Sequence, residues 1–402
     1  MTWRIAVGEL GLQTEEIAFT NQKQEFVEKR VIQKEYVWRS QADNIGGIRN
    51  YYEKLKASSK EDEGPTFIVH KAPVEKKQDL ENATFVVLCR DLDVYELLQT
   101  MQTVQDRFNN LFGYDWVILN DQDFGVEFIT LVANFLMQGT VKFGRVPKDH
   151  WSYPSWIDLD LAQRQREIMD EKGVYNGGSE SYRHMCRFFL GFFYKHPLLL
   201  GYQYYWRIEP GMKILCDINY DVFRFMRENS KKYAFGMSLF EYEQTIPTLW
   251  EHFKNFTRAY NPPEKESFGE MLDFVQNDDT SESYNHCHFW SNFEIADFSV
   301  FRNPHYEAFF NYLDKTGGFF YERWGDAPVH SLAVLWFLSK QDFWWFDDIG
   351  YSHPPYEQCP QSLTSRLQNR CSCDPTEDYL FSFISCSPHL IHILHDDLIF
   401  YD

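Results

Sequence analysis

Four residues that could do chemistry stand at predicted turns or ends of elements in this sequence. Glu209 follows a strand-like aromatic segment and precedes a Pro-Gly pair, which ends a strand and turns the chain. Glu294 follows another aromatic segment, Asp326 stands at the N-cap position of an apolar helix, and His353 precedes two prolines. Carboxylates and imidazoles can bind a metal ion or transfer protons. Each residue also has a structural alternative: an exposed turn residue, a partnered carboxylate, a helix cap and a hydrogen-bonded turn histidine.

Familiar local signatures of catalysis are missing from the sequence. It contains neither Gly-x-Ser-x-Gly nor His-Glu-x-x-His, so it does not support a serine hydrolase or a metalloprotease. The segment Cys89-Arg-Asp-Leu92 has no glycine, which argues against a Rossmann dinucleotide site and a P-loop. A bound nucleotide would instead be held by side chains at strand ends and by a metal ion.

The elements that would position such a site begin with a predicted βαβ unit. Residues 83–89 form a short apolar run typical of a buried strand, and residues 116–119 form another. Between them, apolar residues recur every three or four positions over 94–112, which predicts a helix. Ligands of parallel sheets lie beyond the carboxyl ends of the strands, where this sequence has Arg90-Asp91 and Asn120-Asp121.

Composition and charge narrow the class of protein. Acidic residues outnumber basic ones by 59 to 39 in 402 residues, a formal net charge of −20. Nucleic-acid binders need a clustered positive surface, so this balance argues against one. Phe, Tyr and Trp make up 18% of the chain, which predicts a folded domain with a sizeable core.

We expect two regions. Residues 1–75 read as a stem and peripheral helical region with a charged loop at 58–65, and residues 76–402 as a single large α/β domain. No run of 18 apolar residues predicts a membrane span, and the start of the chain lacks a signal-peptide pattern. The protein is therefore either cytosolic or directed by a segment outside this sequence.

Four of the eight cysteines fall in the last 44 residues: Cys359, Cys371, Cys373 and Cys386. A zinc site is one interpretation of this cysteine-rich tail, but Cys-x-Cys lacks the usual two-residue gap, so we favour disulfides. Sequons at Asn82 and Asn255 also fit the secretory pathway.

Three blocks of the sequence resemble the fungal Golgi α-1,2-mannosyltransferases of glycosyltransferase family 15. They lie within 83–121, 181–210 and 287–356, and include Tyr204-Tyr-Trp-Arg-Ile-Glu-Pro210 and Cys287-His-Phe-Trp-Ser-Asn-Phe-Glu294. The resemblance implies a GT-A type, Rossmann-like mixed sheet flanked by helices. It also implies retaining, manganese-dependent transfer of mannose from GDP-mannose to a mannose hydroxyl on N- or O-linked glycans. The family's enzymes are type II Golgi membrane proteins with luminal catalytic domains, so the resemblance implies a membrane anchor outside this sequence.

The resemblance also assigns roles to individual residues. Glu209 falls on the glutamate of the family's Glu-Pro-Asp metal motif, and His353 on a manganese-binding histidine. Tyr182 falls on a tyrosine near the donor phosphates, Glu294 on the carboxylate proposed as nucleophile, and Asp326 on an acid of the active-site cleft.

Two further positions complete the expected donor site. Arg90, at the first strand end, is expected to contribute phosphate or base contacts. Gly211 stands where the motif has Asp, so a carboxylate that supports metal or ribose binding in the family is missing from this turn.

Two other functions remain open. A non-catalytic carbohydrate-binding protein on a degenerate transferase scaffold would bind sugar alone, and a retaining glycoside hydrolase would need two carboxyl groups about 5 Å apart and no nucleotide. Within the transferase, retention requires either a covalent mannosyl intermediate on Glu294 or front-face attack guided by the leaving phosphate.

Overall fold

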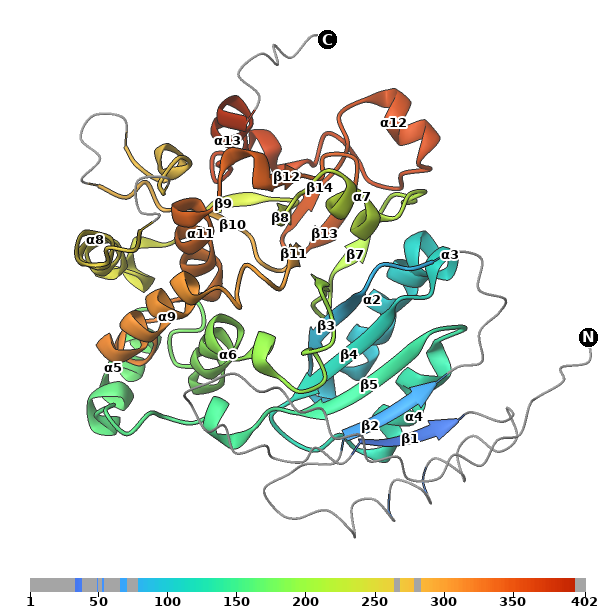
Figure 1. Cartoon of the computed structure of the whole chain (residues 1–402), viewed down its shortest axis with the longest axis horizontal. Coiled ribbons are helices and arrows are strands. Elements are labelled where there is room, and N and C mark those ends of the chain that lie inside the picture. The colour runs from blue at the N-terminus through green and yellow to red at the C-terminus, as the bar shows by residue number, and fades with distance from the viewer. Residues whose placement is uncertain are drawn as a thin grey trace, which may run out of the picture.

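The apolar runs of the sequence form the centre of a nine-stranded mixed sheet in the computed structural model (Figure 1). The structure describes residues 33–37, 49, 53, 66–70, 79–263, 268–277 and 283–394. The strand order is β1-β2-β5-β4-β3-β6-β11-β8-β12, with small sheets β10-β9 and β14-β13-β7 beside it. The strands are β1 (Gln33–Val37), β2 (Thr66–His70), β3 (Ala83–Leu88), β4 (Asp115–Asn120), β5 (Thr140–Arg145), β6 (Tyr204–Arg207), β7 (Lys213–Ile214), β8 (Tyr233–Phe235), β9 (Ser238–Phe240), β10 (Cys287–Phe289), β11 (Glu294–Asp297), β12 (Phe343–Trp345), β13 (Tyr351–His353) and β14 (Tyr356–Gln358).

The predicted βαβ unit is confirmed. β3 pairs in parallel with β4 and with β6, and β4 pairs in parallel with β5, so these four strands end at one edge of the sheet. β11 runs antiparallel to both β6 and β8, which makes the sheet mixed. The predicted helix over 94–112 forms as α2, a π-helical turn Gln105–Asn109 and α3, and it ends at Gly113 with φ of 86°.

Helices cover both faces of the sheet (Figure 1). α2 and α4 pack on one face, and α6, α9 and α11 on the other. The helices are α2 (Val94–Val104), α3 (Asn110–Phe112), α4 (Val126–Phe135), α5 (Leu159–Glu171), α6 (Glu180–Gly191), α7 (Val222–Glu228), α8 (Leu249–Ala259), α9 (Pro304–Thr316), α10 (Gly318–Tyr321), α11 (Asp326–Phe337), α12 (Leu363–Gln368) and α13 (Ser387–Leu394).

Each central strand contributes to both hydrophobic cores because its side chains alternate between the two faces. In β6, Trp206 packs in the core under α2, and Tyr205 packs in the core under α6. In β11, Ile295 and Ala296 divide between the two cores in the same way. Polar side chains on the α6 face of β6 and β11 form hydrogen bonds with one another and with neighbouring residues.

The described part of residues 1–75 differs from the expected peripheral helical region. β1 and β2 belong to the main sheet, with β2 pairing antiparallel to β5, and only residues 49 and 53 are described as helical. The charged loop at 58–65 lies outside the described residues, and the boundary between 75 and 76 stays a prediction. No described helix combines the length and apolar character that crossing a bilayer requires.

Disulfides confirm the preferred interpretation of the cysteine-rich tail. Cys216 pairs with Cys371, Cys287 with Cys386, and Cys359 with Cys373. The two cysteines of Cys-x-Cys therefore belong to different bridges and are not available as a zinc pair. Cys89 and Cys186 are buried free thiols.

Candidate active site

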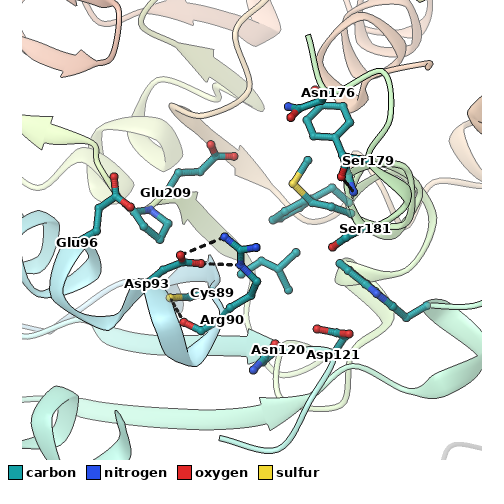
Figure 2. A pocket seen from close by; sticks show the side chains of 16 residues that line it. Cys89, Arg90, Asp93, Glu96, Asn120, Asp121, Asn176, Ser179, Ser181 and Glu209 are labelled. Atoms are coloured by element: carbon teal, nitrogen blue, oxygen red, sulfur yellow. Dashed lines mark hydrogen bonds and ion pairs between the residues drawn. The ribbon is translucent and has the colours of Figure 1, made fainter. Parts of the chain in front are cut away.

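A cavity of about 340 Å³ opens at the edge of the sheet where β3, β4 and β6 end. Arg90, Asn120, Asp121 and Glu209, which follow or end these strands, line it from one side (Figure 2). The start of α6 and the loop before it line the other side. The full lining is Leu88, Cys89, Arg90, Asp93, Glu96, Asn120, Asp121, Trp151, Asn176, Ser179, Ser181, Tyr182, Met185, Phe189, Glu209 and Pro210. The predicted ligand site at this edge thus coincides with a cavity.

Arg90 follows β3, and its guanidinium group lies against the cavity (Figure 2). It donates to both carboxylate oxygens of Asp93, at 2.8 and 3.1 Å. The Arg90 side chain is 60% exposed, and exposed ion pairs of this kind stabilise a fold little. The pair therefore orients a cation at the cavity rather than holding the fold together.

Tyr182 reaches the cavity from the first turn of α6. Ser179 caps this helix by accepting a hydrogen bond from the Tyr182 backbone N–H at 3.1 Å. The N-terminus of α6 therefore faces the cavity, where its dipole favours an anion. Burial raises the pKa of the Tyr182 hydroxyl well above its usual value, so this side chain is a neutral hydrogen-bonding group.

Glu209 and His353 face each other beside the cavity. His353 ends β13, and its Nε2 lies 3.6 Å from Oε2 of Glu209. The other carboxylate oxygen of Glu209 accepts a hydrogen bond from the guanidinium group of Arg207. Both facing side chains are about one quarter exposed, at 27% and 23%. One carboxylate oxygen and one imidazole nitrogen are thus left open to a ligand.

Arg207 is a buried cation that joins two acids. It ends β6, is 2% exposed, and donates to Asp326 as well as to Glu209. Its guanidinium carbon lies 3.7 Å from the centre of the Phe189 ring. Burial alone would lower the pKa of Arg207, but the two carboxylates outweigh burial and raise it. Arg207 therefore stays charged.

Asp326 is the second acid of this network and not a helix cap. The N-cap of α11 is Gly325, and the Asp326 carboxylate accepts hydrogen bonds from Arg207 and, at 2.8 Å, from the Ser291 hydroxyl. The predicted N-cap position is therefore wrong by one residue. Burial would raise the pKa of Asp326, but Arg207 and His330 lower it to about 2.

Glu294 is enclosed more completely than the sequence indicates. It begins β11 opposite Arg207 on β6, and it is only 1% exposed. Its carboxylate accepts hydrogen bonds from Tyr205 and, at 2.7 Å, from Tyr233, and His330 Nδ1 lies 3.1 Å from it. Burial opposes ionisation, but the His330 imidazole, the hydrogen bond from Tyr205 and the charge of Arg207 lower the pKa of Glu294. The carboxylate is charged and fully partnered.

The structure thus divides the predicted site residues into two groups. Arg90, Tyr182 and Glu209 line the cavity, and His353 adjoins it through Glu209. Glu294 and Asp326 are not part of the lining. Arg207 connects them to the cavity residue Glu209, because it donates a hydrogen bond to Asp326 and lies opposite Glu294 on the neighbouring strand.

No sequence pattern singled out four other members of the network: Tyr205, Arg207, Tyr233 and His330. A signal for Arg207 was present, because it stands two residues before Glu209 and strand residues two apart share a face. No pattern in the sequence could have brought His330 to Glu294, since that contact depends on how α11 packs against β10 and α6.

The Glu209–His353 pair suits a divalent cation with a preference for oxygen and nitrogen ligands, such as Mn²⁺. Two protein ligands leave most coordination positions to oxygens of a bound substrate. Elsewhere in the described part of the chain, the one cluster of three potential ligands is Cys216, Cys371 and Cys373, whose sulfurs are in disulfides.

Comparisons with known proteins agree on one family. The family model described as glycolipid 2-alpha-mannosyltransferase matches residues 44–394. The alpha-1,2 mannosyltransferase KTR1 of Saccharomyces cerevisiae is 53% identical over 313 residues, covering 78% of this chain and 79% of that protein. The probable mannosyltransferase MNT3 of Candida albicans is 50% identical over 345 residues, covering 86% and 88%.

Solved structures show the same relationship. Core-mannan synthase A of Aspergillus fumigatus in its Mn/GDP form matches with a TM-score of 0.74 and 37% identity, covering 80% of this chain and 87% of that one. The mannosyltransferase Ktr4p of S. cerevisiae in complex with GDP matches with a TM-score of 0.73 and 32% identity, covering 88% and 93%. The expected GT-A type fold, a mixed sheet flanked by helices, is confirmed by these matches.

Proposed function

This chain belongs to the glycolipid 2-alpha-mannosyltransferase family, and we propose that it transfers mannose from GDP-mannose to a hydroxyl group of a mannose-terminated glycan. The product is an α-1,2 linkage formed with retention. One observation carries the proposal: the Glu209–His353 pair stands beside a cavity at the carboxyl ends of β3, β4 and β6, the edge at which sheets of this kind bind ligands.

We assign Glu209 and His353 to the metal. Arg207 holds one oxygen of the Glu209 carboxylate, which leaves the other oxygen facing His353. Mn²⁺ bound there would neutralise the negative charge that develops on the departing GDP. The Mn/GDP form of the Aspergillus relative supports this choice of ion and nucleotide. A metal also explains how a chain with a net charge of −20 binds a polyanion.

We assign the donor diphosphate to the space between Arg90 and the N-terminus of α6. Arg90 supplies a cation from the end of β3, and the first turn of α6 supplies the positive end of a helix dipole. Tyr182 stands in that same turn as a neutral hydroxyl, which is suited to donate a hydrogen bond to a phosphate oxygen.

We assign Glu294 and Asp326 to the stabilisation of positive charge on the mannose. Both are negatively charged and belong to the network around Arg207. A covalent bond to the sugar would require Glu294 to leave Tyr205, Tyr233 and His330. Front-face attack needs no such rearrangement, so we favour it, with the carboxylates acting through their fixed negative charge.

We further propose that the acceptor belongs to N- or O-linked glycans and that the enzyme works in the Golgi lumen, held by a membrane anchor outside the residues described. Three disulfides support an oxidising compartment. The similarity to core-mannan synthase A of Aspergillus fumigatus supports a role in building fungal mannan.

The proposal is tested by ligand-induced thermal stabilisation followed by a transfer assay. GDP is expected to raise the unfolding temperature only when Mn²⁺ is present, because binding to the folded state alone stabilises it. Incubation with GDP-mannose and methyl α-mannoside should then yield a disaccharide that an α-1,2-mannosidase cleaves. Stabilisation by mannosides but not by GDP with Mn²⁺ would favour a carbohydrate-binding protein, and release of mannose from a mannoside without nucleotide would favour a hydrolase.

A further inference from the structure

Gly211 and Glu96 meet at the wall of the cavity. Gly211 has φ of +90°, a left-handed conformation that side chains disfavour. A Cβ atom at this position would lie 2.7 Å from Oε1 of Glu96, closer than Cβ atoms approach other atoms, so the Glu96 side chain would have to move aside. The carboxylate of Glu96 therefore occupies the space that a side chain at position 211 would enter.

Helix α2 holds this arrangement through two residues on the same face. Thr100 Oγ1 accepts a hydrogen bond from the Gly211 backbone N–H at 3.0 Å, and Glu96 precedes Thr100 by four residues. Residues four apart on a helix are neighbours on its surface. This hydrogen bond thus holds the turn after Glu209 against the part of α2 from which Glu96 reaches the cavity.

Glu96 is an exposed carboxylate that lines the cavity close to Glu209 (Figure 2). Among the described residues it makes no hydrogen bond or ion pair, whereas Asp93, on the same wall, is bound to Arg90. An ionised carboxylate accepts hydrogen bonds and repels phosphate. Within a nucleoside diphosphate, only the hydroxyl groups of the ribose and the N–H groups of the base can donate to it.

We propose that Glu96 binds the nucleoside part of the donor nucleotide, accepting hydrogen bonds from ribose hydroxyls or guanine N–H groups. This inference rests on the proposed function, since it requires GDP in the cavity. Glu96 would then be a carboxylate that determines nucleotide specificity. It stands on α2 and not on the turn that carries the metal ligand Glu209. Gly211 is the residue that makes room for it.

The first test measures binding to wild type and Glu96→Ala by calorimetry with Mn²⁺ present, using GDP and inorganic pyrophosphate. The variant is expected to bind GDP about tenfold more weakly, the effect of one hydrogen bond to a charged group at an exposed site, and to bind pyrophosphate unchanged. Glu228→Ala, at an exposed carboxylate on α7, serves as the control. Equal weakening for pyrophosphate, or no weakening for GDP, overturns the inference.

Nucleotide analogues then identify the donor group. If the ribose donates, Glu96→Ala should not weaken binding of 2′,3′-dideoxy-GDP. If the guanine amino group donates, it should not weaken binding of IDP, and if the guanine N1–H donates, it should not weaken binding of 1-methyl-GDP. The same tenfold loss with every analogue would mean that Glu96 acts without either contact and would contradict the inference. Wild-type protein that binds no GDP would refute the proposed function itself.

A second test moves the carboxylate. Asp tolerates the left-handed region better than most residues, so Glu96→Ala/Gly211→Asp is expected to regain part of the lost GDP affinity. Glu96→Ala/Gly211→Ala carries the same backbone strain without a carboxylate and should regain none. Equal recovery in both double variants, or recovery in neither, would show that the space beside Gly211 is not a nucleoside contact.

Discussion

Replacing Arg207 tests whether one buried cation holds the acids of the site in place. Arg207→Met keeps much of the apolar volume of the side chain but leaves the carboxylate of Asp326, which is 4% exposed, without its cation. Removing one partner of a buried ion pair costs about 3–5 kcal/mol of folding free energy. The same change frees Glu209, so Mn²⁺-dependent GDP binding should be lost in the folded fraction as well.

The assay combines urea unfolding, followed by circular dichroism, with calorimetry of GDP binding. Arg187→Met is the matched control, because Arg187 forms a buried ion pair with Asp314 away from the cavity, at 2.7 Å. Both variants should be destabilised, but only Arg207→Met should lose GDP binding. A loss of stability below about 1 kcal/mol, or normal GDP affinity in Arg207→Met, would show that Arg207 does not hold the acids of the site in place.

A double variant checks the cause of the destabilisation. Arg207→Met/Asp326→Asn removes the unpaired charge, so it should be more stable than Arg207→Met alone. The dependence on pH follows the same logic. The pKa of Asp326 is lowered to about 2 from 3.8, so this carboxyl contributes about 2 kcal/mol of stability above pH 4, lost as the pH falls towards 2. Arg207→Met should lack that acid-sensitive contribution.

Three further outcomes are expected. Glu209→Gln and His353→Ala should each abolish Mn²⁺-dependent stabilisation by GDP, and unaltered metal dependence in either would remove that residue from the metal site. Without ligand, His353→Ala should leave the unfolding temperature nearly unchanged, whereas Glu209→Gln should lower it, because it removes one of the two carboxylates that pair with the buried Arg207. Glu294→Gln should lose most transfer activity, measured by initial rates, but keep its GDP affinity, measured by calorimetry. A mannosyl adduct on Glu294 in a slowed variant, detected by mass spectrometry, would instead favour the covalent mechanism. Replacing both cysteines of the Cys287–Cys386 bridge by serine should lower the free energy of unfolding, measured in urea, by about 2–5 kcal/mol. An unchanged urea midpoint would mean that this bridge does not constrain the unfolded chain.

Local patterns in the sequence were sufficient for the central βαβ unit. The apolar run at 83–89 and the three- and four-residue spacing over 94–112 are produced by neighbours in the chain, and they reappear as β3 and α2. Strand direction then places Arg90 and Asn120 at one edge, which is why the location of the cavity could be predicted. The N-cap of α11 was misplaced by one residue because a cap depends on backbone angles that residue type alone does not determine.

Burial and long-range contacts were beyond the reach of sequence patterns. Glu294 follows an aromatic segment, yet whether its carboxylate meets solvent or Tyr205, Tyr233 and His330 depends on the pairing of β11 between β6 and β8. The pairing of β1 with β2 and of β2 with β5 was missed for the same reason, since the partner of each strand is distant in the chain.

The central α/β unit, the residue types at the strand ends and, through resemblance, the enzyme family could all be inferred from the sequence. Packing of the folded chain was needed to bring these residues to one cavity, to link Glu209 and Asp326 through Arg207, and to place Glu96 in the space beside Gly211. Propensities and periodicities reflect interactions between residues near in the chain. The contacts that tune charge and accessibility join residues far apart in the chain, 119 positions for Arg207 and Asp326 and more for Glu209 and His353. They form only when the sheet and its helices pack.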